Sequence, residues 1–261
     1  MRSLDIAGTG MQAQQTNVEV ISNNIANMTT TGYKRRRAEF QDLIYQNLRR
    51  VGSNSSDSGS VVPAGAQVGL GVKTAAIYRI NEQGNLQQTS NSLDMAVQGN
   101  GYFQVTLPTG ETAYTRDGTF GLAPDGTIVT ADGYVVQPGL QIPSAATSVS
   151  VNTAGQVQVT ISGQTAAQTV GQLQLAAFPN EVGLDAQGGN LFLQTTASGA
   201  PVTGNPATAG FGSVMQGFTE TSNVNVVTEI TNLITAQRAY EMNSRVITTS
   251  NDMLSTLSNL R

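Results

Sequence analysis

The sequence contains no cysteine, no histidine and no tryptophan. These absences exclude thiol nucleophiles, disulfides, zinc sites of the usual Cys/His type, and every Ser-His-Asp or Cys-His catalytic arrangement. Charged residues make up only 11% of the 261 residues, whereas soluble domains average about 25%. We therefore expect no catalytic residues, no cofactor-binding residues and no metal ligands, and we predict that the protein is not an enzyme.

Positive charge and long apolar runs are also scarce. The formal net charge is -4, and the lysines are Lys34 and Lys73 alone. Because binding to a phosphate backbone needs clustered Lys and Arg, we expect no nucleic-acid partner. The sequence has no stretch of about 18 apolar residues and no apolar run after Met1 of the signal-peptide kind. We expect a protein that is not embedded in a membrane, and if it leaves the cytoplasm we expect it to do so without a cleaved Sec signal.

Apolar residues recur every seven positions near both ends of the chain. They predict two long helices, from Leu4 to Met28 and from Val226 to Leu260, each with one a/d seam. Ser3 and Asn225 are the expected N-caps, and Gly32 is the expected stop of the first helix. The series are Leu4, Met11, Val18 and Ile25; Ala7, Gln14, Ile21 and Met28; Val226, Leu233, Tyr240, Ile247 and Leu254; and Ala239, Val246, Met253 and Leu260.

Helical periodicity disappears between these segments. Glycine-centred turns at Gly110, Gly118, Gly126 and Gly133 separate short β-prone runs, which is typical of a meander, sandwich or barrel. Apolar and polar residues alternate from Val157 to Ile161. The sequence therefore predicts an α+β chain, mainly β: an all-β body with terminal helices that pair as a coiled coil.

We expect four regions along the chain. They are a coiled-coil helix at 1–32, a connector with an extended segment at 33–75, the β-body at 76–222 and a second coiled-coil helix at 223–261. Residues 52–66 offer almost no apolar surface, so they are expected to be a linker or a segment that becomes ordered only with a partner.

Two groups of charged residues are candidates for function. The run Lys34, Arg35, Arg36 and Arg37 is too short for nucleic acid and is better explained as a solvated face or a contact with an acidic neighbour. From Asp117 to Gln237 there are seven carboxylates and no Lys or Arg. The basic N-terminal region of one copy could therefore pair with this acidic central region of another copy. Asp117, Asp125 and Asp132 each precede glycine and are better explained by turn formation than by glycoside hydrolysis.

The helices are too long to lie against one small β-domain. A helix of about 25 residues rises about 37 Å. Polar seam residues such as Gln14 and Gln237 favour a specified register, as in assembled coiled coils. If one surface binds a different surface on the next copy, the contact propagates as a filament or tube. The residues alone thus predict a polymer-forming structural protein.

Five segments resemble the bacterial flagellar rod and hook family. Ile21–Asn27 (ISNNIAN) followed by Thr31–Lys34 (TGYK) is similar to its N-terminal signature, and Gln237–Asn243 (QRAYEMN) to its C-terminal counterpart. Within the family, Tyr114–Phe120 (YTRDGTF), Gly171–Ala176 (GQLQLA) and Ser198–Pro201 (SGAP) most resemble the members that build the distal rod.

The resemblance implies a subunit of a rigid hollow drive shaft that transmits torque and serves as an export channel. Its implied partners are other copies of the chain, the proximal rod and hook proteins, and the surrounding bushing rings. It implies export by the flagellar type III apparatus to a basal body spanning the periplasm. The expected assembly seam is Leu4, Met11, Val18, Ile21, Ile25, Leu233, Tyr240, Ile247 and Leu254.

The resemblance also implies a rod-specific segment at about residues 46–67, which packs between subunits and stiffens the tube. Its named positions are Ser53, Asn54, Val61, Val62 and Pro63. Three alternatives stay open: a hook or proximal-rod paralogue, a secreted β-rich glycan hydrolase, and a ligand-binding β-domain with an appended coiled coil.

Overall fold

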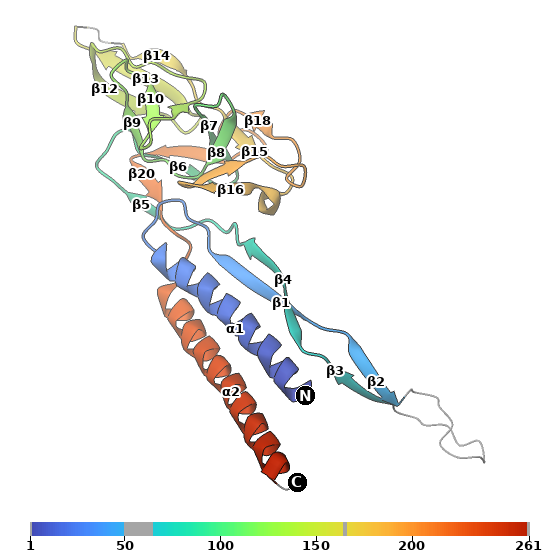
Figure 1. The fold of residues 1–261 in the computed structure, drawn as a ribbon. Coiled ribbons are helices and arrows are strands. Elements are labelled where there is room, and N and C mark those ends of the chain that lie inside the picture. Colours follow the sequence, from blue (N-terminus) through green and yellow to red (C-terminus); the bar gives the residue numbers. More distant parts are fainter. Residues whose placement is uncertain (1, 50–64, 164–165, 260–261) are drawn as a thin grey trace. The chain divides into compact units, whose positions relative to one another are not determined.

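The computed structural model describes residues 2–49, 65–163 and 166–259 (Figure 1). These residues form mostly β-structure with one long helix near each end, so the predicted α+β class is confirmed. The helices are α1 (Arg2–Ala26) and α2 (Val226–Asn259). In the described part of the chain, neither helix is long and apolar enough to cross a membrane.

The described chain divides into two compact units. The helical unit consists of residues 2–25, 36–49, 65–78 and 225–259, and the β-body consists of residues 26–35, 79–163 and 166–224. The helical unit thus combines both helices with the connector strands that follow α1.

In the helical unit, α1 and α2 lie side by side and run in opposite directions (Figure 1). The side chains of Ser3 and Ser250 meet at one end of the pair, and those of Asn24 and Glu229 meet at the other. Two ribbons of two strands complete the unit: β1 (Arg36–Asp42) with β4 (Val72–Arg79), and β2 (Tyr45–Arg49) with β3 (Ala66–Gly69).

The helix ends follow the predicted signals only in part. The Asn225 side chain accepts a hydrogen bond from the Thr228 backbone N–H at 3.2 Å, which confirms it as the N-cap of α2. Ser3 lies inside the first turn of α1, so its assignment as N-cap is wrong. Gly32 adopts the expected positive φ of 67°, although α1 already ends at Ala26.

The β-body contains several antiparallel sheets in its described residues. A short 3₁₀ helix spans Glu181–Gly183. The smaller sheets are β5 (Leu86–Gln88) with β20 (Phe218–Glu220), β6 (Met95–Gln98) with β19 (Ser213–Gln216), and β12 (Ala146–Val151), β13 (Gln156–Ile161) and β14 (Gln168–Gln172). The largest sheet holds β7 (Tyr102–Thr106), β8 (Thr112–Thr115), β9 (Phe120–Leu122), β10 (Ile128–Thr130), β11 (Val135–Val136), β15 (Leu175–Ala177), β16 (Asp185–Gly188), β17 (Leu191–Leu193) and β18 (Val202–Gly204).

Strand β7 organises the body because side chains alternate between its two faces. Phe103 and Val105 point into one apolar core, where the Phe103 ring meets Phe120 edge-on at 5.1 Å. Tyr102 points into a second, aromatic core and contacts Phe178 edge-on at 6.0 Å. Both faces of the sheet are therefore buried, which holds the body together without disulfides.

The predicted alternation from Val157 to Ile161 is confirmed. These residues belong to β13, and Val157 and Val159 are buried in the first core. The turn glycines at positions 110, 126 and 133 all have a positive φ. Local residue patterns thus predicted β13 and three of the four turn glycines, whereas Gly118 does not have a positive φ.

Replacing Phe103 by Ala should lower the free energy of unfolding of the β-body by about 3–5 kcal/mol, because it empties a fully packed site. Leu122→Ala is the control, since Leu122 is 48% exposed and its truncation should cost within about 0.5 kcal/mol. Urea unfolding followed by circular dichroism measures both. Equal losses in the two variants would contradict the assigned core.

Candidate assembly surfaces

Helix α2 leaves many large apolar side chains in solvent. Val227 is 77% exposed, Met242 62% and Met253 54%. Ile230, Ile234, Tyr240, Val246 and Leu254 are exposed as well. An apolar surface of this extent on one element is typical of a contact with another protein surface.

The predicted seam residues are less buried than a closed pair of helices would require. Ile21 is buried, whereas Tyr240 and Leu254 are exposed. The other six, which are Leu4, Met11, Val18, Ile25, Leu233 and Ile247, are half-buried. The described chain therefore covers this seam only in part.

Asn24 is a buried connection that the sequence analysis missed. Its amide donates to the Arg36 carbonyl and accepts from the Arg36 backbone N–H, both at 2.8 Å. The same amide nitrogen lies 3.4 Å from a carboxylate oxygen of Glu229. Asn24 thus ties α1 to the start of β1 and to the first turn of α2. A signal for Asn24 was present in the sequence. Asn24 recurs at seven-residue spacing with Ser3, Gly10 and Asn17, one position before the apolar series that ends at Ile25.

The ribbon strands are almost wholly exposed. Every residue of β2 is exposed, and so are the apolar side chains of Ile44 and Ile77. An isolated two-stranded ribbon is at best marginally stable in water. We therefore expect the β2–β3 ribbon to pack against a further protein surface. The positions predicted for the rod-specific segment, Ser53, Asn54, Val61, Val62 and Pro63, lie outside the described residues.

The basic run does not form one exposed cluster. Lys34 is only 3% exposed, and its ammonium contacts the Glu220 carboxylate at 2.5 Å and the Glu82 carbonyl at 2.9 Å. Arg35 pairs with the exposed Glu82 side chain at 3.6 Å, whereas Arg36 and Arg37 are exposed. The expectation of a solvated face therefore fails at Lys34, because its acidic partner belongs to the same chain.

Glu220 is the centre of a buried ionic cluster in the β-body. The second carboxylate oxygen lies 3.8 Å from the Arg116 guanidinium, and the first also accepts from the Gly84 N–H at 2.9 Å. Burial lowers the pKa of the Lys34 ammonium, while the Glu220 carboxylate opposes this shift. Breaking such a pair is costly because the remaining charge stays buried.

Burial of basic side chains leaves the described surface of the β-body without a fully exposed positive charge. The basic residues of the described β-body are Lys34, Arg35, Arg79 and Arg116, of which three are buried and Arg35 is half-buried and paired. The carboxylates of Glu111, Asp125 and Asp132 are exposed. The described surface of the body therefore presents acidic groups without a fully exposed cation.

The turn aspartates do not form a catalytic pair. One oxygen of Asp117 accepts from the Thr119 N–H at 3.0 Å, and one oxygen of Asp125 accepts from the Thr127 N–H at 3.0 Å. These bonds confirm the predicted turn role of both residues. The backbone hydrogen bond from Thr127 lowers the pKa of Asp125, whereas a general acid needs a raised pKa.

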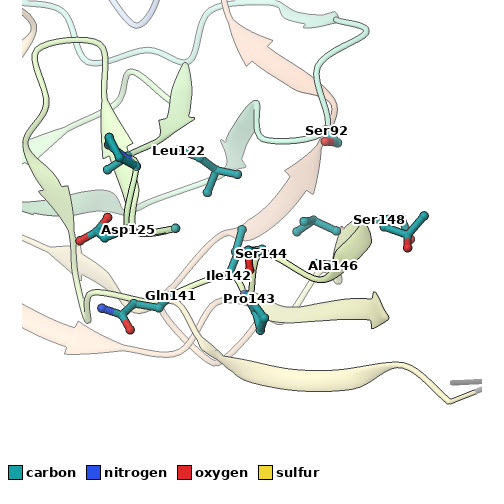
Figure 2. A pocket seen from close by; sticks show the side chains of 14 residues that line it. Ser92, Leu122, Asp125, Gln141, Ile142, Pro143, Ser144, Ala146 and Ser148 are labelled. Carbon is teal, nitrogen blue, oxygen red and sulfur yellow. The ribbon is translucent and has the colours of Figure 1, made fainter. Parts of the chain in front are cut away.

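A surface pocket of about 670 Å³ lies beside Asp125. Figure 2 shows Asp125 and Gln141 at one side and Ser148 at the other. Asp125 is the only titratable residue that lines this pocket among the described residues. Asp117 and Asp132 line a separate cavity of about 30 Å³, which has room for about one water molecule. Neither cavity offers two carboxylates around a space that fits a sugar.

Three family profiles match separate segments of the chain, near its two ends and in its middle. Residues 4–34 match "Flagella basal body rod protein", residues 96–159 match "Flagellar hook protein FlgE/F/G D1 domain", and residues 215–260 match "Flagellar basal body rod FlgEFG protein C-terminal". The first and third profiles cover most of α1 and α2, and the second covers the centre of the β-body.

Curated relatives extend the match over the full length. The flagellar basal-body rod protein FlgG of Caulobacter vibrioides is 58% identical over 261 residues, with 100% of both chains covered. FlgG of Agrobacterium fabrum is 53% identical over 99% of this chain and 98% of the relative. The flagellar hook protein FlgE of Treponema pallidum is 43% identical, but over only 60% of this chain and 34% of the hook protein.

The chain belongs to the FlgG family of flagellar basal-body rod proteins. FlgG proteins are structural subunits of the distal rod, so the predicted family and the prediction that the protein is not an enzyme are confirmed. The membership excludes the glycan hydrolase alternative. It also places this FlgG-family protein in the flagellar basal body.

Replacing Glu220 by Gln should lower the free energy of unfolding by about 3–5 kcal/mol, because Lys34 and Arg116 stay buried without a counter-charge. Glu82→Gln is the matched control. It removes an exposed ion pair with Arg35 and should cost at most about 1 kcal/mol. Chemical denaturation of both variants checks the difference, and a Glu220→Gln variant as stable as Glu82→Gln would refute the assigned role of the cluster.

Proposed function

We propose that this chain polymerises into the rigid hollow tube of the distal rod, which transmits torque and serves as an export channel. The observation that carries the proposal is the row of exposed apolar residues on α2, from Val227 to Leu254. Each such side chain gains about 1.5–3 kcal/mol when it leaves water. Identical copies of the chain are the partners expected in a rod.

The proposed contact is heterologous: one surface of a subunit binds a different surface of the next. Such contacts continue into a helical tube unless their rotation closes a ring. The terminal helices of neighbouring copies would pack as coiled coils at the inner wall. Their half-buried and exposed seam residues, such as Leu4, Leu233 and Tyr240, would become buried there.

The ribbons supply a second proposed contact. Their exposed residues Ile44, Leu48 and Ile77 are available to a neighbouring subunit. The exposed Arg36 and Arg37 suit an acidic body surface on another copy. The rod-specific segment that follows β2 would pack in the same region and stiffen the tube.

The remaining proposals concern location and partners. The tube would span the periplasm, join proximal rod to hook and turn inside the bushing rings. Export would go through the flagellar type III apparatus without a cleaved signal. The absence of cysteine from the sequence suits a chain that is exported unfolded, since no disulfide can form on the way.

The variant Ile234→Gln/Met242→Gln should raise the protein concentration needed for polymerisation by at least tenfold. Both residues are exposed on α2, and the loss of about 1.4 kcal/mol of contact energy already corresponds to tenfold. Thr235→Gln/Thr248→Gln, at exposed polar positions of the same helix, is the control and should polymerise normally. Sedimentation and electron microscopy measure both.

Equal polymerisation of the two variants would exclude the apolar face of α2 as an assembly surface. Closed rings in place of open tubes would exclude the rod geometry and favour a closed oligomer.

Deletion of Ser53–Val62 tests the stiffening role. A distal-rod subunit lacking this segment should form tubes that bend more easily, seen as a shorter persistence length in electron micrographs. The hook protein, whose match covers part of this chain, represents the alternative. If the deletion leaves tube stiffness unchanged, the chain behaves as a hook-type subunit in this respect.

A further inference from the structure

Three close contacts between α1 and α2 involve small and polar residues. The Ser3 and Ser250 hydroxyls lie 3.3 Å apart. Gly10 lies so close to α2 that a Cβ at this position would stand 2.9 Å from the amide nitrogen of Asn243. Asn24 and Glu229 form the third contact, at 3.4 Å.

These contacts share one spacing. A step of seven residues along α1, from Ser3 to Gly10, is matched by a step of seven backwards along α2, from Ser250 to Asn243. The step from Gly10 to Asn24 is likewise matched by the step from Asn243 to Glu229. By the same spacing, Asn17 and the buried Ala236 form a fourth layer between them. We call these four layers the polar seam.

Burial along the polar seam is deep on α2. Glu229 is 5% exposed, and Ala236 and Ser250 are each 2% exposed, although their neighbours along the helix are exposed. On α1, the predicted apolar series lies one position after the residues of the polar seam, which is about 100° around the helix. This apolar series is Leu4, Met11, Val18 and Ile25. Close packing within one chain therefore uses one side of each helix, and most of the apolar series lies beside it.

Apolar series alone do not fix the register of two helices. Because they repeat every seven residues, a slip by one heptad brings apolar residues opposite each other again. A slip in one direction disrupts the polar seam. Shifted by seven residues in one direction, Asn243 would meet Asn17 in place of Gly10, and Glu229 would lose Asn24.

We propose that the fit of Asn243 against Gly10, with the Asn24–Glu229 contact, sets the register of α1 against α2 within one subunit. The polar seam thereby decides which side of α2, with its exposed Val227, Ile234 and Met242, remains open as the exposed face. The inference deepens the proposed function and rests on it, because that face is the one proposed to bind neighbouring copies. Gly10 and Asn243 act as positioning residues for assembly.

The register can be read directly by disulfide formation, because the natural chain has no cysteine. Ser3→Cys/Ser250→Cys should form an intrachain disulfide, since the two hydroxyl oxygens are 3.3 Å apart and a disulfide needs adjacent side chains. Asn17→Cys/Ser250→Cys, which keeps Gly10, Asn24, Glu229 and Asn243 in place, reports a register slipped by two heptads. Mild oxidation followed by non-reducing electrophoresis and mass spectrometry compares the two pairs, in dilute and in concentrated protein.

In dilute or in concentrated protein, the Ser3→Cys/Ser250→Cys pair should form its disulfide about tenfold faster than the slipped pair. A tenfold ratio corresponds to about 1.4 kcal/mol in favour of the proposed register. Equal rates in both states, or a faster second pair, would overturn the register.

A second set of variants tests Gly10 itself with the Ser3→Cys/Ser250→Cys pair. Gly10→Asn puts a side chain against Asn243 and should slow disulfide formation about tenfold. Gly8→Asn is the matched control, because a Cβ at Gly8 meets nothing within 4 Å. The exchange Gly10→Asn/Asn243→Gly restores one glycine and one asparagine to the layer and should recover most of the rate.

If Gly10→Asn behaves like Gly8→Asn, the proposed role of Gly10 fails. Electron microscopy of the same variants separates this result from a failure of the proposed function. Tubes formed equally well by both glycine variants would refute the link between register and assembly while the rod function stands. A correct disulfide pattern without any tubes would leave the register intact and refute the rod function.

Discussion

Helix α2 carries more large apolar side chains than the described chain covers, and the proposed assembly depends on this imbalance. Val227, Ile230 and Met242 remain in solvent although each would gain free energy on burial. The most deeply buried residues of α2 are instead small or polar, such as Ala236 and Ser250. In the proposed assembly, binding of other copies would bury the exposed side chains and supply this free energy.

The β-body meets a different demand, because it must keep its shape without disulfides. Two cores cover both faces of the sheet around β7, and the cluster of Lys34, Arg116 and Glu220 closes the part of the body nearest in sequence to the terminal helices. Two of the boundaries between the units lie close to this cluster in the sequence, because the body segment 26–35 ends one residue after Lys34 and the segment 79–224 ends four residues after Glu220.

Sequence reasoning succeeded where the signal is local. Both helices, the cap at Asn225 and the turn roles of Asp117 and Asp125 follow from residue spacing and side-chain chemistry within a few positions. It failed at Lys34, because Glu220 is remote in the sequence and nothing near Lys34 indicates a buried partner. The role of Gln14 and Gln237 in the register of an assembled coiled coil stays a prediction, and the close contact within the single chain at Gly10 and Asn243 was not predicted. Small residues leave no hydrophobic signal, so the seven-residue series of Ser3 and Gly10 was hidden beside that of Leu4 and Met11.

The central claim is that the apolar face of α2 becomes buried between copies. The most direct test is the rate of methionine oxidation by peroxide in dilute protein and in polymerised protein, measured residue by residue with mass spectrometry. Met242 and Met253 are exposed in the single chain, and Met95, 1% exposed in the β-body, is an internal reference. The account predicts that polymerisation protects Met242 and Met253 while Met95 reacts slowly in both states. Rates at Met242 and Met253 that stay as fast in the polymer as in the monomer would contradict it.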